Sequence, residues 1–370
     1  MMKILIGFIM DGNAGGIDKY LLNFLEKVSS KKVKLDFLTN EVDSDLEKKL
    51  KTYGSKIYAI QNLKHPITQY RQVKAIIKAG QYDAVYLNIS TAIDCVAVIA
   101  AKHAKVKRVM IHSHSSGNDC ESTLKRKIFN VIHKFCRLFL YKYGTEFYAC
   151  SIKAGEWMFP KTIVESEHFH VIHNAVDRKR FEYNIEKRER MRAELNITDQ
   201  FVLGHVGNFC YQKNHYFLLD VFEEIHKRDK DTILILAGDG IRFEQVKRII
   251  TRKGLDDSVK LLGRRGDIDL LYQAMDAFIL PSNFEGLPIA GIEAQSAGLL
   301  TFMSTQITKE SKITQNCYFI PLSKKPSYWA EEILKRKKMR ASAMYLDNAG
   351  QYDLANQEQE LFQLVKNAEI

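Results

Sequence analysis

Two carboxylates, Glu285 and Glu293, stand eight positions apart in a segment whose residue types suit the binding of a phosphorylated sugar. The apolar run 276–280 predicts a short buried strand that Pro281 ends, and the turn at 286–288 opens a helix. The first amides of a helix lack intrahelical partners and carry the positive end of its dipole, so they favour an anion such as a diphosphate. Carboxylates on either side would accept hydrogen bonds from hydroxyl groups. The alternative is that Glu285 caps the helix and Glu293 is solvated.

This Glu-x7-Glu spacing, with its Gly-Leu-Pro turn and Glu-Ala-Gln-Ser-Ala-Gly tail, resembles the signature of the retaining family 4 glycosyltransferases. The resemblance implies that Glu293 binds the ribose hydroxyls of a nucleotide and that Glu285 binds the donor sugar. It assigns the donor phosphate to the amides of Gly286 and Leu287. It also implies the GT-B architecture, an α/β fold in which two doubly wound, Rossmann-like domains face a cleft.

A second segment, 204–214, resembles the family loop whose arginine and lysine neutralise the donor diphosphate. Lys213 occupies the lysine position, but Asn208 stands where the arginine is expected. A charge-assisted hydrogen bond to phosphate contributes about 1.5–3 kcal/mol, so this departure predicts weaker donor binding unless another cation replaces it. Arg264 and Arg265 are the candidates for that replacement.

Two further loops follow predicted strands of the second half of the chain. Gly238, Asp239 and Gly240 form one, and Arg265 lies in the other, 262–268, which resembles the family loop that packs on the nucleotide base through its backbone. By itself the Gly-Asp-Gly run would be an ordinary turn. The resemblance places both loops at the nucleotide.

A glycine-rich loop also follows the first predicted strand, and it includes Gly15 and Gly16. Such a loop lets backbone amides approach a phosphate or a sugar, although its spacing does not fit the G-x-G-x-x-G pattern of nicotinamide sites. It resembles the family's Gly-Gly loop, whose glycines face donor and acceptor. The alternative is a simple tight turn.

His112 and His114 terminate another predicted strand, and the carboxyl ends of parallel strands are where such sheets bind ligands. Either imidazole can bond a sugar hydroxyl, and the resemblance favours His112 for that contact, with His114 second. Two histidines two residues apart also suit a metal, but the sequence identifies no further ligand. One of the pair is expected to be structural.

Strand and helix patterns alternate through both halves of the chain, which favours parallel sheets covered by helices on both faces. The expected strands are 3–8, 34–38, 84–88, 108–112, 147–149 and 170–172, followed by 201–207, 232–237, 259–262, 277–280, 300–302 and 317–320. Helical patterns such as 16–28 and 70–79 separate them. We expect an N-terminal acceptor-side domain (1–190), a nucleotide-sugar-binding domain (191–345), and terminal helices (346–370) that cross back to the first domain. The domain boundary is expected within the charged stretch 181–196.

Composition is that of an ordinary globular protein, with 370 residues and 46% hydrophobic content. The six cysteines show no CxxC pair or metal spacing, which is typical of reduced thiols in a cytosolic protein. The N-terminus has no signal-peptide cleavage pattern, and no apolar run reaches the ~20 residues of a membrane-spanning helix. We therefore expect a cytoplasmic protein.

Positive charge concentrates in the first half, where residues 1–195 carry 33 Lys and Arg against 21 Asp and Glu; residues 196–370 carry 22 against 23. The densest stretch, 125–142, places aromatic residues at helical spacing among basic ones. It predicts either an amphipathic helix on an anionic membrane surface or a core helix with a basic solvated face. No zinc-finger, RNP or basic-region pattern supports nucleic-acid binding.

Together these features predict transfer of a sugar from a nucleotide diphosphate sugar, expected to be a UDP-sugar, to a hydroxyl of a lipid-linked glycan in capsular or exopolysaccharide assembly. The resemblance implies retention by a front-face route in which the leaving diphosphate takes the acceptor proton. No cofactor or metal is expected, since Asp43-Ser44-Asp45 is better interpreted as a solvated helix start than as a metal motif. We expect peripheral contact with the inner face of the membrane. The alternatives are a nucleotide-sugar-binding partner subunit, which Asn208 favours, and an epimerase of the same fold.

Overall fold

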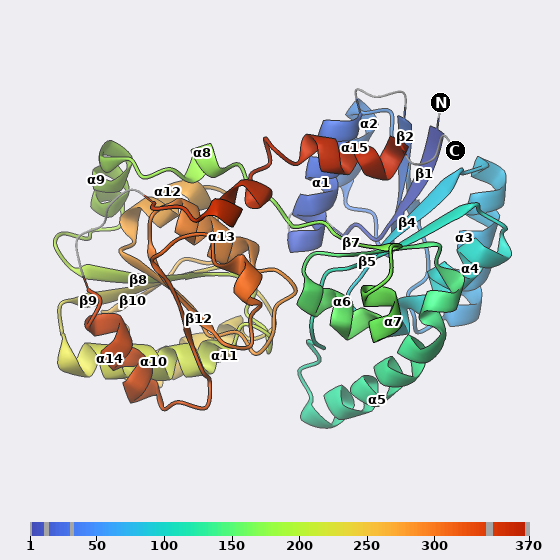
Figure 1. Cartoon of the computed structure of the whole chain (residues 1–370). Coiled ribbons are helices and arrows are strands. Elements are labelled where there is room, and N and C mark those ends of the chain that lie inside the picture. Colours follow the sequence, from blue (N-terminus) through green and yellow to red (C-terminus); the bar gives the residue numbers. More distant parts are fainter. Residues whose placement is uncertain (1, 11–14, 30–32, 338–342, 367–370) are drawn as a thin grey trace. The chain divides into compact units, whose positions relative to one another are not determined.

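The computed structural model describes residues 2–10, 15–29, 33–337 and 343–366. The chain forms two compact units, one from Met1–Ala175 with Leu354–Ile370 and the other from Val176–Asp353. We call them the N-terminal and C-terminal units. Each is built around one parallel sheet with helices packed against it (Figure 1). The predicted α/β fold of two doubly wound domains is therefore confirmed.

The sheet of the N-terminal unit has the strand order β3-β2-β1-β4-β5-β6-β7, with every pairing parallel. Its strands are β1 (Met2–Gly7), β2 (Val33–Thr39), β3 (Ile57–Ala59), β4 (Ala84–Ile89), β5 (Arg108–Ser113), β6 (Glu146–Ala149) and β7 (Phe169–Val171). The chain winds outward from β1 in one direction and from β4 in the other. The loops after β1 and β4 therefore diverge at the carboxyl edge, which is where open α/β sheets bind ligands.

The helices of this unit are α1 (Gly16–Val28), α2 (Ser44–Thr52), α3 (Pro66–Gly80), α4 (Cys95–His103), α5 (Thr123–Leu140), α6 (Ile152–Met158), α7 (Lys161–Val164) and α15 (Glu358–Lys366). Two single turns of 3-10 helix, η1 (Ala92–Asp94) and η2 (Tyr141–Tyr143), complete it. Asp43 accepts hydrogen bonds from the amides of Asp45 and Leu46 and so caps α2. The interpretation of Asp43-Ser44-Asp45 as a helix start is confirmed.

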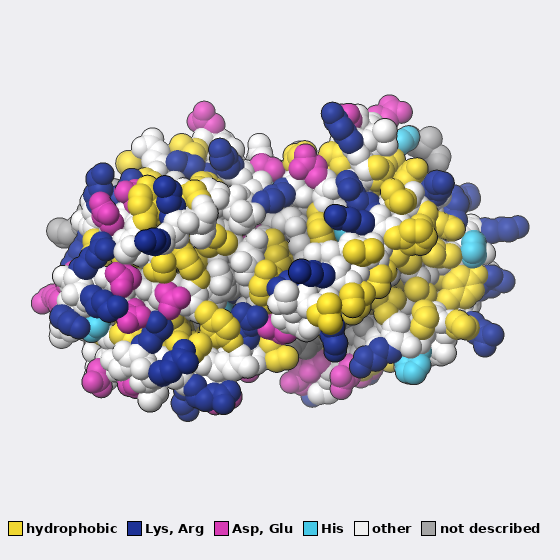
Figure 2. All heavy atoms as spheres, turned by 90° about the horizontal axis from the view of Figure 1, so that it is seen from below, with side chains coloured by type: hydrophobic (Ala, Val, Ile, Leu, Met, Phe, Trp, Pro, Cys, Tyr) yellow, Lys and Arg dark blue, Asp and Glu magenta, His cyan; other side chains and the backbone are white. Residues whose placement is uncertain are grey.

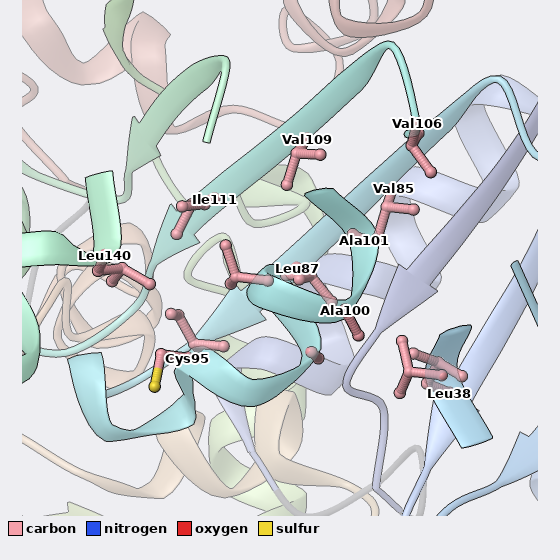
Figure 3. Close-up of a cluster of buried hydrophobic side chains, with 14 of the residues drawn as sticks. Leu38, Val85, Leu87, Cys95, Ala100, Ala101, Val106, Val109, Ile111 and Leu140 are labelled. Carbon is pink, nitrogen blue, oxygen red and sulfur yellow. The ribbon is translucent and has the colours of Figure 1, made fainter. Parts of the chain in front are cut away.

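The core of the N-terminal unit lies on both faces of its sheet, because successive side chains of a strand point to opposite sides. Leu5, Val85 and Val109 contribute to one cluster, which Figure 3 shows with α4 packed over it. Tyr86 and Met110 contribute to the opposite cluster. All six residues of β4 are buried. This explains why the central strands are continuous apolar runs in the sequence.

The C-terminal unit repeats this plan with the strand order β10-β9-β8-β11-β12-β13, again with every pairing parallel. Its strands are β8 (Phe201–Val206), β9 (Thr232–Ala237), β10 (Val259–Leu261), β11 (Ala277–Leu280), β12 (Leu300–Ser304) and β13 (Cys317–Ile320). The winding reverses between β8 and β11. The loops after these two strands carry Lys213 and Glu285, so the topology by itself brings them to one place.

The helices of the C-terminal unit are α8 (Arg178–Phe181), α9 (Ile185–Glu194), α10 (His215–Arg228), α11 (Phe243–Arg252), α12 (Ile268–Ala274), α13 (Ile289–Ser296) and α14 (Pro326–Leu334), with the 3-10 helices η3 (Lys309–Ser311) and η4 (Asp347–Tyr352). Phe222 of α10 and Trp329 of α14 are fully buried in the core cluster of this unit. Helices therefore cover the sheet as the alternating pattern predicts.

The division between the units falls at Ala175 and Val176, earlier than the expected boundary at 190 and 191. The charged helix α9 packs against α12 and belongs to the C-terminal unit. Arg188 and Arg192 both bond Asp276, at 2.6 and 3.4 Å, and Arg192 donates to the carbonyl of Ala274 at 2.9 Å. These arginines are anchors, although their sequence resembles a solvated linker.

The last helix, α15, returns to the N-terminal unit and packs against α1 (Figure 1). Leu361, Leu364 and Val365 are buried in the same cluster as the core of the first sheet. The preceding η4 belongs to the C-terminal unit.

The strand β3 was not expected from the sequence. It has three residues at the edge of the sheet, none of them buried, although residues 57–60 form a short apolar run. Within the described residues, every helix is too short or too polar to cross a membrane.

Candidate active site

The loops after β8 and β11 are joined by backbone contacts before any side chain of the site is considered. The amide of Asn283 donates to the carbonyl of Gln212 at 2.8 Å, and its side chain donates to the carbonyl of Tyr211 at 2.7 Å. Asn214 donates to the carbonyl of Pro281 at 3.1 Å. These bonds hold the two loops at a set distance, so residues distant in sequence form one cluster.

Glu285 is the centre of that cluster and is 4% exposed. Its Oε1 accepts from Lys213 Nζ and from Ser282 Oγ, both at 2.7 Å, and its Oε2 accepts from Gln212 Nε2 at 2.8 Å. Burying two charges is costly unless they are paired and hydrogen-bonded, and here both conditions are met. Glu285 and Lys213, which the sequence placed at the sugar and the phosphate, therefore form one charge pair.

Glu293 lies on α13 and is also buried, with 4% of its surface exposed. Tyr272 directs its hydroxyl to Glu293 Oε2 and to the carbonyl of Ala290, each at 3.1 Å. α13 begins after Pro288 and has no side-chain cap among the described residues. The alternative in which Glu285 caps this helix and Glu293 is solvated is therefore wrong.

Gly286 and Leu287 form the buried turn between Glu285 and the start of α13. This is where an anion would meet the positive end of the helix. α13 is eight residues long, so its dipole acts mainly through the first turn. The turn thus lies in sequence between the two carboxylates, as the Glu-x7-Glu spacing predicts.

Gly238 and Gly240 have a packing role that the sequence did not reveal. Their φ angles are +137° and +152°, in the region that favours glycine. A Cβ on Gly238 would lie 2.0 Å from the carbonyl oxygen of Gly207, and one on Gly240 would lie 2.7 Å from that of Phe209. The 238–240 loop therefore lies directly against the loop after β8. Asp239 between them is exposed, and its Oδ1 accepts from the amide of Gly240 at 2.7 Å.

Asn208, which occupies the expected arginine position, is exposed at the end of β8. Arg265 bonds Asp267 at 2.8 and 2.6 Å and Glu194 at 3.1 Å, so its charge is already paired. Arg242 is closer to Asn208, because its amide donates to the carbonyl of Phe209 at 2.8 Å. The Arg242 guanidinium lies over the rings of Tyr216 and Tyr211, at 4.8 and 5.5 Å.

Two buried histidines lie beneath the loop after β8. The rings of His205 and His215 meet edge to face at 4.7 Å, and His205 Nδ1 bonds the carbonyl of Ile279 at 2.8 Å. Burial lowers the pKa of His205 to about 4, and burial together with the charges of His205, Lys213 and Arg242 lowers the pKa of His215 well below its usual range. Both imidazoles are neutral near pH 7. The positive charges of Lys213 and Arg242 thus both lower the pKa of the buried His215 ring.

The histidines of the N-terminal unit form a separate polar network at the end of β5. His112 is fully buried, and its Nδ1 lies 2.5 Å from the hydroxyl of Tyr86, which lies 2.8 Å from the hydroxyl of Tyr20. His114 is half-buried, and its Nε2 lies 2.9 Å from Asn88 Oδ1. The two imidazole rings are 4.0 Å apart. The nitrogens His112 Nε2 and His114 Nδ1 are buried with no hydrogen-bond partner among the described residues.

Burial lowers the pKa of both histidines, to about 3 for His114 and well below the usual range for His112, where the nearby His114 adds to the effect. Two adjacent neutral imidazoles can donate and accept hydrogen bonds without carrying charge. Among the described residues no group of three or more metal-ligating side chains could hold a metal ion. The pair therefore suits a hydroxyl-bearing ligand better than a metal.

Part of the glycine-rich loop after β1 lies outside the described residues, namely positions 11–14. Gly15 is the N-cap of α1 with extended backbone, and a Cβ there would meet nothing within 4 Å. Gly16 is the first residue of α1. The described backbone does not require glycine at position 15, in contrast to position 238.

The sequence interpretation missed several residues of both networks. Gln212 and Ser282 stand beside named site residues in the chain, and that adjacency was the available signal. Tyr86 and Asn88 are two positions apart on β4, beside the strand that carries His112. Polar groups at the end of a central, otherwise apolar strand indicate a ligand site or a buried network. Tyr272 carries no such signal, because its pairing with Glu293 depends on how α12 packs beside α13.

Comparison with known proteins relates both halves of the chain to glycosyltransferases. A family model described as glycosyl transferases group 1 matches residues 187–351, and one described as glycosyltransferase family 4 matches residues 14–180. The protein EpsF of Bacillus subtilis (strain 168), named as a glycosyltransferase, is 29% identical over 333 residues, which are 87% of this chain and 85% of EpsF. A UDP-Gal:alpha-D-GlcNAc-diphosphoundecaprenol alpha-1,3-galactosyltransferase of Escherichia coli is 31% identical over 257 residues, 68% of this chain and 64% of that enzyme.

Among solved structures, Anabaena Alr3699/HepE in complex with UDP-glucose has a TM-score of 0.76 at 18% identity, covering 99% of this chain and 100% of that one. At that identity the likeness concerns the fold. The two family models lie one on each unit and together account for most of the chain. The chain therefore belongs to the family 4 glycosyltransferases of GT-B fold.

Proposed function

We propose that this protein transfers a sugar from a UDP-sugar to a hydroxyl of a lipid-linked glycan during surface polysaccharide assembly, with retention of the anomeric configuration. The observation that carries the proposal is the buried cluster in which Glu285 holds Lys213 beside the start of α13, with Glu293 about one turn into that helix. The cation and the helix start suit the diphosphate of a nucleotide sugar, and the two carboxylates suit the hydroxyl groups of its sugar and its ribose.

In this proposal Glu293 accepts hydrogen bonds from the ribose hydroxyls, held in place by Tyr272. Lys213 and the amides that follow Gly286 receive the diphosphate. Glu285 accepts hydrogen bonds from hydroxyl groups of the sugar. Ser282 and Gln212 donate hydrogen bonds to the same carboxylate. UDP as the nucleotide is supported by the UDP-glucose complex of the Anabaena protein and by the UDP-Gal donor in the name of the Escherichia coli relative.

The chemistry then requires mainly stabilisation of charge. As the bond between sugar and phosphate breaks, negative charge grows on the diphosphate and positive charge on the sugar ring. Donors that are already in place stabilise the leaving group without reorganisation, and removal of one such donor typically costs 10²–10³-fold in rate. A front-face route needs no protein nucleophile, because the departing phosphate takes the acceptor proton. We propose no metal in this step.

We assign the missing cation to Arg242. Its backbone is bonded to Phe209, the neighbour of Asn208, and its charge lowers the pKa of His215 together with that of Lys213. Arg265 is committed to Asp267 and Glu194. Arg242 thus offers a second positive group where the family arginine is absent.

The neutral pair His112 and His114 is assigned to recognition of a sugar hydroxyl. Neutral imidazoles suit a neutral hydroxyl, since they pair with it without attracting counter-ions. A lipid-linked acceptor is supported by the diphosphoundecaprenol-linked substrate in the name of the Escherichia coli relative. Such an acceptor would be met at the inner face of the membrane.

The test is to incubate purified protein with a panel of nucleotide sugars, with and without membrane lipid extract, and to measure released nucleotide. We expect lipid-dependent release with one UDP-sugar, a sharp fall in Glu293→Ala, and no change in the control Glu331→Ala, an exposed residue of α14. NMR of the glycosidic linkage in the product reports whether the anomer is retained. Binding of UDP without turnover under every condition would favour the partner subunit. Conversion of the donor sugar without acceptor would favour the epimerase.

A further inference from the structure

Helix α5 exposes a larger share of its apolar residues than an ordinary helix at the surface of a globular protein. Such a helix normally buries apolar residues and exposes polar ones. In α5 the buried residues are His133, Cys136 and Leu140, while Leu124, Val131, Phe135 and Leu138 are exposed. The exposed face of α5 is therefore apolar as well as basic, which differs from a core helix with a basic solvated face, one of the two interpretations of this segment.

Specific polar bonds hold α5 in this orientation. His133 accepts from the amide of Ala92 at its Nδ1, 3.0 Å away, and its Nε2 bonds the carbonyl of Trp157 at 3.0 Å. The His133 ring stacks on the Trp157 ring at 3.8 Å. Arg137 donates from Nε to the carbonyl of Phe159 at 3.1 Å. Turning the helix over would break these bonds, so the exposure of its apolar side is part of the fold.

The exposed apolar residues form one continuous stripe. Leu124, Ile128, Val131, Phe135 and Leu138 follow each other at spacings of four and three, which places them on one face of a helix. Leu124 is 70% exposed, Val131 and Leu138 are 68% exposed, and Phe135 is 66% exposed. We call these five residues the α5 stripe. A contiguous patch of this kind on a protein surface marks a contact with a membrane or another protein.

The charges beside the α5 stripe are all of one sign. On a helical projection Lys125 flanks one side of the stripe, and Lys127 and Lys134 flank the other. All three lysines are exposed, and α5 contains no acidic residue. Figure 2, which views the molecule from below, shows hydrophobic side chains gathered on the N-terminal unit with Lys and Arg at their rim.

We propose that the α5 stripe docks onto an anionic lipid bilayer, with its apolar side chains in the interface and its lysines at the lipid head groups. An apolar stripe with a basic border is what an interfacial helix requires. The proposal rests on the proposed function, because a lipid-linked acceptor requires the enzyme to work at a membrane. It adds the surface that makes the contact and can be measured without turnover.

A second copy of this chain fits the α5 stripe less well. Two stripes packed against each other would bring lysines from both copies together, and like charges beside a helix pair oppose association. No acidic side chain of α5 is available to offset them. Anionic lipid offers the opposite charge along the whole helix.

The experiment is co-sedimentation of the full chain with vesicles of phosphatidylcholine alone or with 30% phosphatidylglycerol, roughly the anionic content that gives each basic residue a measurable contribution. We expect binding only to the anionic vesicles, weakened by salt. The triple variant Val131→Gln, Phe135→Gln, Leu138→Gln should lower the partition coefficient by about a hundredfold, since three apolar groups lose their burial. Lys127→Gln with Lys134→Gln should lower it by about tenfold or more.

Matched controls come from other exposed positions. Ile67→Gln on α3 and Ile185→Gln on α9 remove exposed apolar groups elsewhere, and Lys78→Gln with Lys102→Gln removes two exposed lysines. These variants should bind vesicles as the wild type does. Glutamine is a good helix former and the replaced side chains are exposed, so circular dichroism should show the triple variant folded.

Equal vesicle binding by the triple variant and the wild type would overturn the proposal, as would no binding by the wild type. A wild-type dimer in size-exclusion chromatography that the triple variant converts to monomer would assign the stripe to a second copy instead. Failure of the proposed function appears differently, as absence of nucleotide release with any donor while vesicle binding persists. UDP binding by the triple variant should equal that of the wild type.

Discussion

The two units share one sheet topology but end their central strands with opposite chemistry. In the C-terminal unit the loops after β8 and β11 present a buried ion pair, Lys213 with Glu285. In the N-terminal unit the ends of β4 and β5 present uncharged groups, among them Tyr86, Asn88 and His112. Both networks are nearly excluded from water. The same backbone plan can therefore carry a charged network or a neutral one, and the strand-end side chains make the difference.

The free-energy cost of burying titratable side chains is offset differently in each network. A buried carboxylate needs a partner, which is why Glu285 has three donors around it. A buried histidine can avoid the cost by staying neutral, and burial lowers the pKa of His112 for that reason. A substitution that leaves a buried charge unpaired should therefore disrupt the first network, and a fall in pH that protonates the histidine should disrupt the second.

The largest effect is expected from breaking the Lys213–Glu285 pair. Lys213→Met leaves Glu285 buried without its cation, which typically costs about 3–5 kcal/mol of stability. The rate of nucleotide release should fall by about 10²–10³-fold. Adding Glu285→Gln to Lys213→Met should restore most of the stability, measured by urea unfolding, without restoring transfer.

An exposed pair provides the control for this experiment. Lys51 and Glu47 pair at 3.0 Å on α2, where the lysine is largely exposed and the glutamate is half-buried. Lys51→Met should change stability by less than about 1 kcal/mol. If Lys213→Met were equally harmless, the ion pair would not be what stabilises the cluster.

A second contrast between the units concerns glycine. Gly238→Ala places a Cβ against Gly207 at a positive φ, so it should lower the free energy of unfolding by on the order of 3 kcal/mol. Gly15→Ala in the N-terminal unit meets open space and should leave stability within about 0.5 kcal/mol. Thermal unfolding of the two variants compares them directly. A stable Gly238→Ala protein would contradict the close packing of the two loops.

The neutral network predicts a dependence of stability on acid. Because the folded pKa of His112 lies below its unfolded value, the unfolded chain binds more protons as pH falls through about 6.5. Stability is fully present above that pH and decreases below it, by up to about 1.4 kcal/mol per pH unit for each such histidine. His112→Gln should make the loss between pH 6.5 and 5 shallower in urea unfolding. An unchanged slope would mean that His112 does not titrate on unfolding.

The smallest effect is expected from the cation that compensates for Asn208, which stands where an arginine is expected. Arg242→Ala should weaken UDP binding by about tenfold, and Asn208→Arg should recover much of that loss in the double variant, because a charge-assisted bond contributes roughly 1.5–3 kcal/mol. Isothermal titration calorimetry with UDP measures both. Arg248→Ala, which removes an exposed arginine of α11, is the control and should bind UDP as the wild type does. Wild-type affinity in Arg242→Ala would exclude Arg242 as the replacement.

Local pattern was sufficient to predict most of the fold. Apolar runs flanked by turns located the inner strands, and their alternation with helices predicted two doubly wound sheets. The edge strand β3 was missed, although residues 57–60 form a short apolar run. The boundary was placed too late because Arg188 and Arg192 look like solvated charges, and only their bonds to Asp276 identify them as anchors.

For the candidate site, the sequence predicted that the loops after β8 and β11 come together but not how their residues pair. Lys213 and Glu285 were assigned separate duties, whereas the structure joins them at 2.7 Å. Tyr272 and Arg242 carried no sequence signal, because their roles arise from packing between elements that lie apart in the chain. Arg265 was a candidate cation, and its pairing with Asp267 and Glu194 could not be foreseen.

The sequence by itself determined the family, most of the strand and helix plan, and the location of the loops that hold Glu285 and Lys213 and of the helix that holds Glu293. These follow from short-range patterns, since hydrophobic periodicity and turn residues act over a few positions. Tertiary structure alone decided which charges are buried as partners, which glycines have no alternative, and which side of α5 faces outward. These outcomes depend on contacts between distant segments, and the free energy of a buried charge or an exposed apolar stripe exists only once those contacts are formed.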